Sequence, residues 1–281
     1  MTDDSADAGW FRGLDPGDLD AARDAVDHGG TDTPADWPSR AVTAGFAADE
    51  DDYYDALHDA TVNATREAVR ERERADDQQL KYGVRAMDDA ERTANELAER
   101  VSEWAGAVFD DAPTGVDGAR DVAARDPGTP AERRAVSLAE RVVDLADEAD
   151  DLRAYIERTA PAVAPNLSRM AGAVLAARLI ALAGGLGDLA KKPSGTVQVL
   201  GAEDALFAHL SGRAPSPKHG VIYTHDYVRN TRPEDRGSAA RALAGKLTIA
   251  ARIDHYAGDL RPSLHEELDE RIATIRARAD S

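Results

Sequence analysis

Residues 129–156, TPAERRAVSLAERVVDLADEADDLRAYI, decide how most of this chain folds. Thr129, Pro130 and Glu132 carry the start signal of a helix: an N-cap, a proline at the first helical position and the acidic half of a capping box. The apolar side chains that follow are separated by alternating steps of four and three residues, at Ala131, Ala135, Leu138, Val142, Leu145, Ala149, Leu152 and Ile156. This spacing predicts a helix with one continuous apolar seam, as in a coiled coil.

A matching seam precedes it between residues 80 and 108. Its apolar positions step by three or four residues over roughly four heptads, at Leu80, Val84, Met87, Ala90, Ala94, Leu97, Val101, Trp104 and Val108. The link at 110–128 contains two prolines and three glycines. Two seams and a breaker-rich link predict an antiparallel helical hairpin. A bundle in which both helices pack on a globular core would show the same pattern.

The pattern of apolar residues changes after residue 160. Residues 167–183 are apolar on most sides, which predicts a buried helix that ends at Gly184-Gly185. A long helix is predicted over 233–256. Residues 196–200, TVQVL, have β propensity, but the sequence offers them no partner strand. Because no alternation of strands and helices is present, the fold class is all-α.

These patterns divide the chain into four parts. Residues 1–49, rich in Asp, Gly and Pro, indicate a short and poorly structured N-terminal module with one helix near 16–26. Residues 50–159 are the helical, coiled-coil-like hairpin. Residues 160–260 form a compact all-helical domain, and 261–281 a C-terminal helix.

Composition limits the function classes. The 281 residues carry a formal net charge of −19 and no cysteine. Such an acidic excess is typical of halophilic proteins, with an ordinary acidic mesophilic protein as the alternative. Lack of cysteine excludes a disulfide framework and a thiolate metal site. The N-terminus MTDDSADAGW lacks the apolar stretch of a signal peptide, and no apolar run is long enough for a bilayer span. We therefore expect a cytoplasmic protein without membrane contact.

Positive charge is concentrated in one region. Residues 161–259 hold twelve Lys and Arg against eight Asp and Glu, a formal charge of +4, whereas the other residues hold 22 against 45. Four of the five lysines lie in this region. A positively charged segment in an otherwise acidic chain indicates a polyanionic partner.

The cations are densest between residues 213 and 236, with Tyr223 and Tyr227 interleaved. Guanidinium groups suit phosphates and flat rings suit unstacked bases, a combination typical of RNA binding. On charge alone, a solvated loop is the alternative. The candidate RNA-binding residues are Arg213, Lys218, His219, Arg229, Arg232 and Arg236.

The sequence gives no support to catalysis or to a cofactor. The glycine-rich run at 184–187 follows a helix and lacks dinucleotide-binding spacing, and no nucleophile-elbow or phosphate-loop motif is present. The histidines and acids of the basic region match no metal-ligand spacing: His209, His219, His225, His255, Asp226 and Asp254. We expect a protein that is not an enzyme and holds no metal.

Three stretches carry a resemblance to a known family. They are APNLSRMAGAVLAARLIALAGGLGDLAKKPSGTVQVLGAEDALFAHL (164–210), SPKHGVIYTHDYVRN (216–230) and RGSAARALAGKLTIAARIDHYAGD (236–259). Together they resemble the archaeal Nop-domain family, scaffolds of box C/D small ribonucleoproteins that are related to the eukaryotic nucleolar Nop proteins. Upstream, DDQQLKYGVRAMDDAERTANELAERVSEW (76–104) is similar to the first coiled-coil helix of that family.

The resemblance implies a function and a set of partners. A scaffold of this family binds kink-turn guide RNA together with a small kink-turn-binding protein of ribosomal type. It positions fibrillarin for RNA-guided 2′-O-methylation and pairs with a second copy through its coiled coil. On the matching positions, Gly201, Ala202, Glu203 and Asp204 are the expected contacts to the partner protein, and His219 lies where the RNA–protein composite is contacted. We expect Phe207, just beyond, to be core. A helical module that binds only proteins is the alternative function.

The chain also departs from the family pattern. Asp204 stands where the family commonly has lysine, and the link between the seams is shorter than the usual coiled-coil tip. About fifty unlike residues replace an α/β N-terminal domain of more than a hundred. The implied recruitment of fibrillarin rests on this replaced segment.

Overall fold

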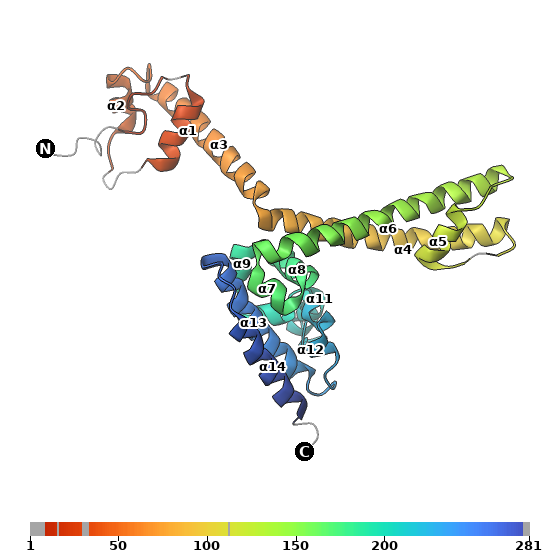
Figure 1. The fold of residues 1–281 in the computed structure, drawn as a ribbon. Helices are drawn as coiled ribbons and strands as arrows, with labels where there is room; N and C mark the ends of the chain where they lie inside the picture. The colour runs from red at the N-terminus through yellow and green to blue at the C-terminus, as the bar shows by residue number, and fades with distance from the viewer. Residues whose placement is uncertain (1–8, 16, 30–33, 112, 278–281) are drawn as a thin grey trace. The chain divides into compact units, whose positions relative to one another are not determined.

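The computed structural model describes residues 9–15, 17–29, 34–111 and 113–277. Every regular element in those residues is a helix (Figure 1), which confirms the all-α class. The helices fall into two compact units that divide between Ala75 and Asp76. The sequence predicts the first boundary after residue 49. In the structure, the helix at 50–74 instead belongs to the N-terminal unit and not to the hairpin. The boundaries after residues 159 and 260 stay predictions.

The N-terminal unit is built from three helices: α1 (Leu19–His28), α2 (Trp37–Thr43) and α3 (Glu50–Arg74). Each begins after an aspartate whose carboxylate accepts a backbone N–H of the first turn. Asp18 accepts from Ala21 at 3.1 Å, and Asp49 accepts from Asp52 at 2.9 Å. The helix predicted near 16–26 is therefore confirmed as α1.

An aromatic cluster gives this unit its own core. Trp10, Phe11, Phe46 and Tyr53 pack in edge-on, tilted or stacked pairs, with ring centroids 5.2–6.2 Å apart. The Trp10 indole Nε1 donates to the Tyr53 hydroxyl at 3.2 Å. Phe11 and Tyr53 are each 3% exposed. Four rings therefore stabilise a module that its composition predicted to be poorly structured.

The hairpin consists of α4 (Asp76–Val108) and α6 (Pro130–Val163), which lie side by side (Figure 1). The capping box at the start of α6 is confirmed. The backbone N–H of Glu132 donates to the Thr129 hydroxyl at 3.2 Å, and the Glu132 carboxylate accepts from the Thr129 N–H at 3.3 Å. The backbone N–H of Gly128, which donates to the Glu132 carboxylate at 2.7 Å, is the main cause that holds the pKa of Glu132 below its usual range, and the hydrogen bonds from Thr129 add to it. Leu80, Met87 and Ile156 are fully buried at the base of the hairpin.

The far end of the hairpin is a three-helix arrangement that the sequence did not predict. The link at 110–128 contains α5 (Gly115–Ala123), whose Ala119 and Val122 pack between α4 and α6. Where α5 packs on α4, the buried face of α4 differs from the predicted seam. Beyond Ala94, the buried positions are Ala98, Val101 and Ala105, and the predicted seam residue Trp104 is 40% exposed.

The remaining helices form the head of the larger unit. They are α7 (Pro165–Ala171), α8 (Ala173–Ala183), α9 (Leu186–Lys191), α10 (Ser194–Val199), α11 (Glu203–Leu210), the 3₁₀ turn η1 (Val221–Thr224), α12 (Asp226–Arg229), α13 (Arg236–Tyr256) and α14 (Pro262–Ala277). Apart from α11, which buries none of its residues, they share one apolar core with the base of the hairpin. Side chains of α14, among them Leu268 and Ile272, belong to the same core.

The buried helix predicted over 167–183 is two helices. The chain bends by 117° between α7 and α8, at Gly172, whose φ of +79° suits only glycine. Gly184, in the left-handed conformation at φ +105°, ends α8 as predicted. Among the described residues, no single helix is long and apolar enough to cross a membrane, and only the bent pair α7–α8 passes that test by length and composition.

Two further local structures prepare the candidate interface. Residues 194–199 form α10 and not the strand that their β propensity suggested, because no strand is present among the described residues to pair with them. A side chain of α13 holds the start of α7 in place. The buried Asp254 carboxylate accepts from the backbone N–H groups of Asn166, at 3.0 Å, and Leu167, at 2.8 Å. The helices behind the interface are therefore joined by hydrogen bonds as well as by apolar packing.

Candidate nucleic-acid interface

The interface begins with a backbone pairing between the end of α10 and the segment before η1. The N–H of Gly220 donates to the Gln198 carbonyl at 2.8 Å, and the N–H of Val221 donates to the Leu200 carbonyl at 2.7 Å. The Gln198 side chain also donates to the Lys218 carbonyl at 2.7 Å. A Cβ on Gly220 would lie 1.9 Å from the Leu200 oxygen, so only glycine permits this approach. Residues 218–221 are therefore held firmly against the head.

Four side chains meet next to this pairing, and we call them the Tyr223 cluster: Lys218, His219, Tyr223 and Arg236. The His219 and Tyr223 rings stack, with centroids 4.6 Å apart and planes inclined by 22°. The Arg236 Cζ lies 5.4 Å from the Tyr223 ring centroid, a cation–π distance. The Lys218 side chain runs along the start of α13, about 3.8–4.0 Å from the position a Cβ on Gly237 would take.

The electrostatics of the cluster favour an uncharged imidazole. Partial burial, followed by the nearby Arg236 and Lys218 charges, lowers the pKa of His219 below its ordinary 6.5. The imidazole is therefore neutral at pH 7 and presents a flat ring with two cations beside it. Such a surface suits stacking on an unpaired base while Lys218 contacts a phosphate.

Arg236 also organises the turn that carries two other predicted cations. Its guanidinium donates to the carbonyls of Thr231 at 3.0 Å and Arg229 at 3.4 Å. Arg229 is exposed and pairs with Asp226 at 2.7 Å, so its charge is partly neutralised. Arg232 is exposed on the same turn. The structure thus gathers five of the six predicted RNA-binding residues on the segment before η1 and on the 229–236 turn.

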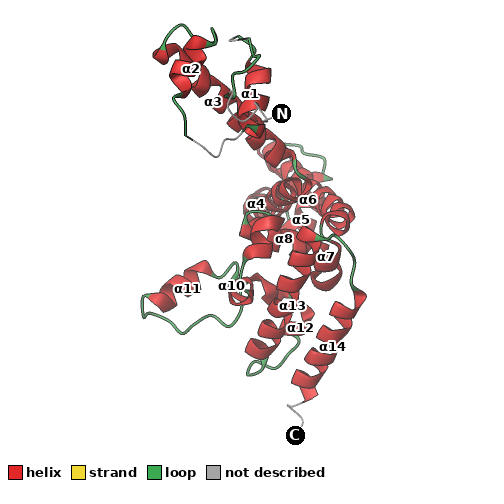
Figure 2. Ribbon diagram, turned by 90° about the vertical axis from the view of Figure 1, so that its left-hand side faces the viewer, coloured by secondary structure: helices red, strands yellow, loops and turns green. Residues whose placement is uncertain are grey.

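Arg213 does not join them. Its guanidinium lies 5.7 Å from the Phe207 ring centroid and donates to the Ser211 hydroxyl at 2.9 Å, next to α11. Figure 2 shows α11 set apart from α12 and α13, with a long loop between α11 and η1. Because no residue of α11 is buried, the expected core position of Phe207 is wrong: its side chain is 66% exposed, and Leu210 is 75% exposed.

The predicted partner-protein contacts lie where the chain enters α11. Gly201 has a φ of +79° and packs against Val221. Its N–H donates to the Glu203 carboxylate at 2.9 Å, so this acid already takes one of the donors at the helix start. Ala202 occupies the N-cap position, and Asp204 is exposed in the first turn. Two carboxylates at a helix start disfavour a phosphate there, so this surface suits a protein better than RNA.

Two residues of the interface were not singled out by the sequence. Gln198 positions the Lys218 segment, and its one visible signal is a polar residue inside the apolar run VQVL. Arg85, on α4, donates to the Ala181 carbonyl of α8 at 3.3 Å, close to the loop that carries Tyr223. Arg178, also on α8, is paired within the protein, because its guanidinium contacts the Asp88 carboxylate. In the described part of the chain, no cluster of His, Asp or Glu could hold a metal ion.

Comparison with known proteins places this geometry in a family. The model of the family described as "Nop: snoRNA binding domain, fibrillarin" matches residues 129–274. An uncharacterised NOP5 family protein of Methanocaldococcus jannaschii is 47% identical over 141 residues, which are 50% of this chain and 34% of that protein. Nucleolar protein 58 of Debaryomyces hansenii is 37% identical over 148 residues, 50% of this chain and 29% of that protein. Mouse nucleolar protein 56 is 39% identical over 141 residues, 49% of this chain and 24% of that protein.

The likeness to these relatives is partial, since the matched stretch spans about a third or less of their length. A crystal structure of a fibrillarin/Nop5p complex has the same fold over 96% of this chain and 99% of that chain, with a TM-score of 0.53 and 24% identity. The family match runs from the start of the second hairpin helix to the last helix and takes in just over half of the 281 residues. This chain therefore belongs to the Nop family, whose members carry a snoRNA-binding domain.

Proposed function

We propose that this protein is a non-catalytic scaffold of a box C/D ribonucleoprotein, acting in the cytoplasm. It binds kink-turn guide RNA together with a small kink-turn-binding protein and positions fibrillarin for 2′-O-methylation of ribosomal or transfer RNA. The observation that carries this proposal is the Tyr223 cluster, in which a neutral imidazole, a tyrosine ring and two cations share one surface of the matched family region.

The cluster can bind RNA at high ionic strength. At molar salt the Debye length is about 3 Å, so attraction between separated charges is weak, and release of counterions from phosphates gains little. Stacking on a base is far less sensitive to salt and is worth about 1–3 kcal/mol per base. A stacked His219–Tyr223 pair with adjacent cations therefore suits an acidic chain better than a broad cationic surface would.

The kink-turn protein is the proposed partner of the α11 region. Its docking surface comprises Gly201, Ala202, Glu203 and Asp204, extended by the exposed Phe207 and Leu210. The carboxylates at the helix start favour a partner that presents cations, since the family's usual lysine is replaced by Asp204. The exposed ring of Phe207 supplies the apolar contact that a stable protein interface needs at its centre.

Fibrillarin is the proposed partner of the N-terminal unit. One neighbour of known structure is titled a fibrillarin/Nop5p complex, and its fold extends over nearly all of this chain. Residues 1–75 have their own aromatic core, so they can be removed as one unit. Capture of fibrillarin by the full chain, and its loss in the chain that begins at residue 76, is the expected result. Equal capture by both would contradict this assignment.

A second copy of the chain is the proposed partner of the hairpin. Its far end is closed by α5, yet Trp104 remains 40% exposed there, which leaves apolar area for a dimer contact. Light scattering at micromolar concentration should give the mass of a dimer. A strict monomer would refute the pairing and leave RNA binding unaffected.

The deciding experiment is a gel shift with kink-turn RNA at high salt, with and without the kink-turn-binding protein. We expect a shift that strengthens when the small protein is present. A helical module that binds only proteins is the second candidate, favoured by the exposure of Phe207 and Leu210. Absence of a shift under both conditions would favour that candidate.

A further inference from the structure

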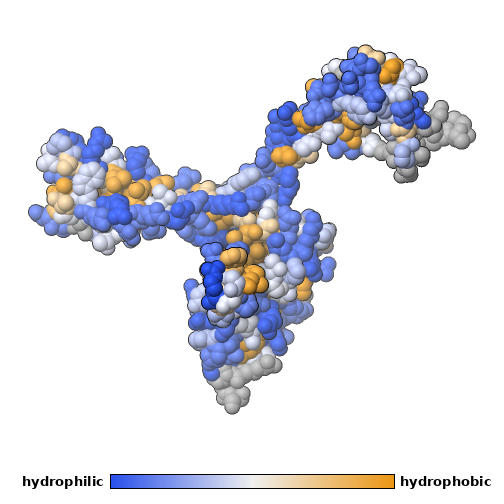
Figure 3. All heavy atoms as spheres, turned by 180° about the vertical axis from the view of Figure 1, so that it is seen from behind, coloured by the Kyte–Doolittle hydropathy of each residue, from blue (hydrophilic) through white to orange (hydrophobic). Residues whose placement is uncertain are grey.

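A groove of about 430 Å³ runs beside the Tyr223 cluster, between the base of the hairpin and the head. Its walls include Arg85 and Asp88 of α4, Arg178 and Leu182 of α8, and Tyr223. Figure 3 shows apolar side chains gathered on the head next to the base of the hairpin. Leu182 is 43% exposed in this groove, although it lies on an otherwise buried helix. We name this feature the α4–α8 groove.

The two arginines of the groove differ in their partners. Arg178 is neutralised by Asp88, to which it donates from Nε at 3.2 Å as well as from Nη2. Arg85 is exposed and donates one N–H to the Ala181 carbonyl. No carboxylate among the described residues pairs with Arg85. A guanidinium has five N–H donors, so most of those of Arg85 stay available to an anion.

Tyr223 connects the groove with the proposed RNA surface. Its ring is stacked against His219 on the cluster side, and it also lines the α4–α8 groove. A strand of RNA that stacks on His219 can therefore continue into the groove without leaving the protein. The volume is within the range of small-ligand sites but too small for a duplex, so it suits one unpaired nucleotide.

We propose that the α4–α8 groove binds one unpaired nucleotide of the RNA, with the base against Leu182 and Tyr223 and the phosphate on Arg85. This inference rests on the proposed RNA-binding function. It adds the first hairpin helix to the RNA surface, because Arg85 lies on α4 and outside the basic region at 161–259. The hairpin thus contributes to RNA recognition as well as to assembly.

The test uses the full chain, kink-turn RNA and the small kink-turn protein. Arg85→Glu reverses the proposed phosphate contact, and Leu182→Trp fills the groove from an exposed position. Arg92→Glu makes the same charge change on the same helix at an exposed site outside the groove. We expect each groove variant to weaken RNA binding about tenfold and Arg92→Glu to change it less than about twofold. Circular dichroism verifies that all three keep the wild-type helicity.

Photocrosslinking identifies the occupant. RNAs that carry a single 4-thiouridine, moved through the unpaired positions, should crosslink to peptides of α4 or α8 at one position, and Arg85→Glu should abolish that crosslink. Wild-type RNA affinity and crosslinks in both groove variants would overturn the groove and leave the proposed function standing. A loss confined to binding of the kink-turn protein without RNA would make the occupant a protein. A wild-type chain that binds no RNA would overturn both proposals.

Discussion

His219 stacks on the Tyr223 ring at a centroid distance of 4.6 Å, and Arg236 of α13, from another part of the chain, lies 5.4 Å from the centre of the same ring. The stack fixes the imidazole in one orientation, and the guanidinium joins that stack to the long helix behind it. Because the orientation exists without ligand, an RNA base would bind a surface that is already ordered.

Removal of the Tyr223 ring should weaken RNA binding without unfolding the head. Tyr223→Leu keeps apolar contact with the core and removes the stacking partner of His219. We expect about a tenfold loss of affinity, since one base stack is worth about 1–3 kcal/mol. Fluorescence anisotropy with kink-turn RNA measures it. Tyr82→Leu, at a 44% exposed position of α4, is the matched control. Equal affinity of both variants would argue against stacking.

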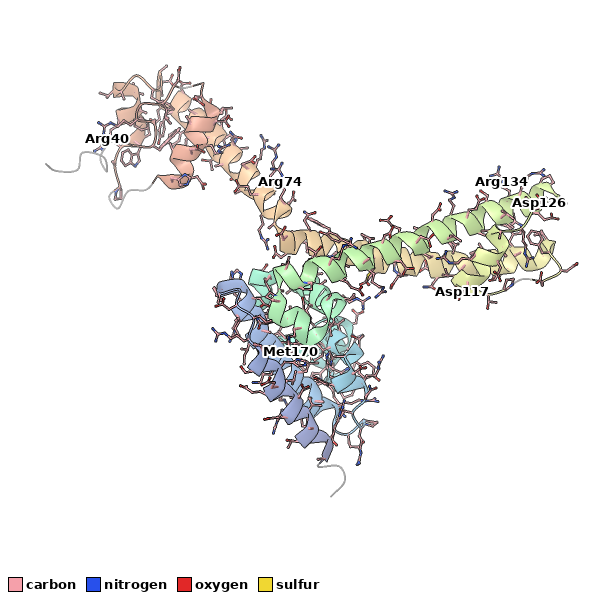
Figure 4. All side chains as sticks on the ribbon, in the orientation of Figure 1. Arg40, Arg74, Asp117, Asp126, Arg134 and Met170 are labelled. Carbon is pink, nitrogen blue, oxygen red and sulfur yellow. The ribbon has the colours of Figure 1, made fainter. Side chains whose placement is uncertain are left out.

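Charge reversal at the interface should weaken assembly in a salt-dependent way. Lys218→Glu and Arg229→Glu place carboxylates where phosphates are expected, so we predict about a tenfold loss at low salt that shrinks as salt is raised. Arg134→Glu, at the far end of the hairpin (Figure 4), serves as the control and should bind as wild type. A loss of equal size in Arg134→Glu would mean that net charge alone governs binding.

The sequence predicts the hairpin and the interface segment because their signals are local. The capping box at Thr129 and the seams need only the chemistry of one helix, and the cations at 218–236 need only composition. Predictions from the sequence are wrong where a contact with a distant segment of the chain decides whether a side chain is buried. The spacing predicts Trp104 in the seam, but α5 packs on α4 there and other residues of α4 are buried. The sequence predicts Phe207 in the core, but no local signal shows that α11 buries none of its residues.

The same limit applies inside the interface. Arg213 and Arg236 look alike in the sequence, yet one packs on Phe207 and the other on Tyr223. What separates them is the backbone pairing between α10 and Gly220, which brings 218–223 to the start of α13 and leaves α11 outside. A pairing between Gln198 and Gly220, with α11 between them in the chain, leaves no periodic signal in the sequence.

Asp254 should be one of the most sensitive positions for stability. Its Oδ1 accepts from the Asn166 backbone and side-chain N–H groups, and its Oδ2 accepts from the Leu167 N–H. Asp254→Asn turns one acceptor into a donor that faces another donor, which should lower the free energy of unfolding by about 2 kcal/mol. Asp259→Asn is the control, because only the Asp259 backbone carbonyl is used. Urea unfolding compares them, and equal midpoints would contradict the role given to Asp254.

His225 should make the head less stable in acid. Its Nε2 donates to the Met170 carbonyl at 3.0 Å and its Nδ1 accepts from the Tyr227 N–H at 3.1 Å, an arrangement that needs the neutral ring. Figure 4 places Met170 within the head. Burial is the main cause that lowers the pKa of His225 below 6.5. The unfolded chain therefore binds the proton more tightly, so stability is complete above pH 6.5 and falls as the pH drops through the lowered value.

The check on this prediction is a series of unfolding curves between pH 5 and 7.5. Wild type should lose stability toward pH 5, and His225→Gln should show a smaller slope together with a lower stability at pH 7. His209→Gln, on α11 where no residue is buried, should keep the wild-type slope. A His225→Gln slope equal to that of wild type would assign the acid sensitivity to other groups, of which His219 is the first to test because burial lowers its pKa as well.

Gly220 links the fold to the interface, and its replacement should separate RNA binding from stability. A Cβ at Gly220 would lie 1.9 Å from the Leu200 oxygen, so Gly220→Ala must push residues 218–221 away from α10 and displace Lys218 and His219. We expect at least a tenfold loss of RNA affinity with most helicity kept. Gly245→Ala is the control: it lies in α13 with open space around its Cβ, and it should bind RNA as wild type while gaining up to about 1 kcal/mol of stability. RNA affinity that survives Gly220→Ala would show that the position of the Lys218–His219 segment does not matter, and with it the Tyr223 cluster would lose its place in the proposed interface.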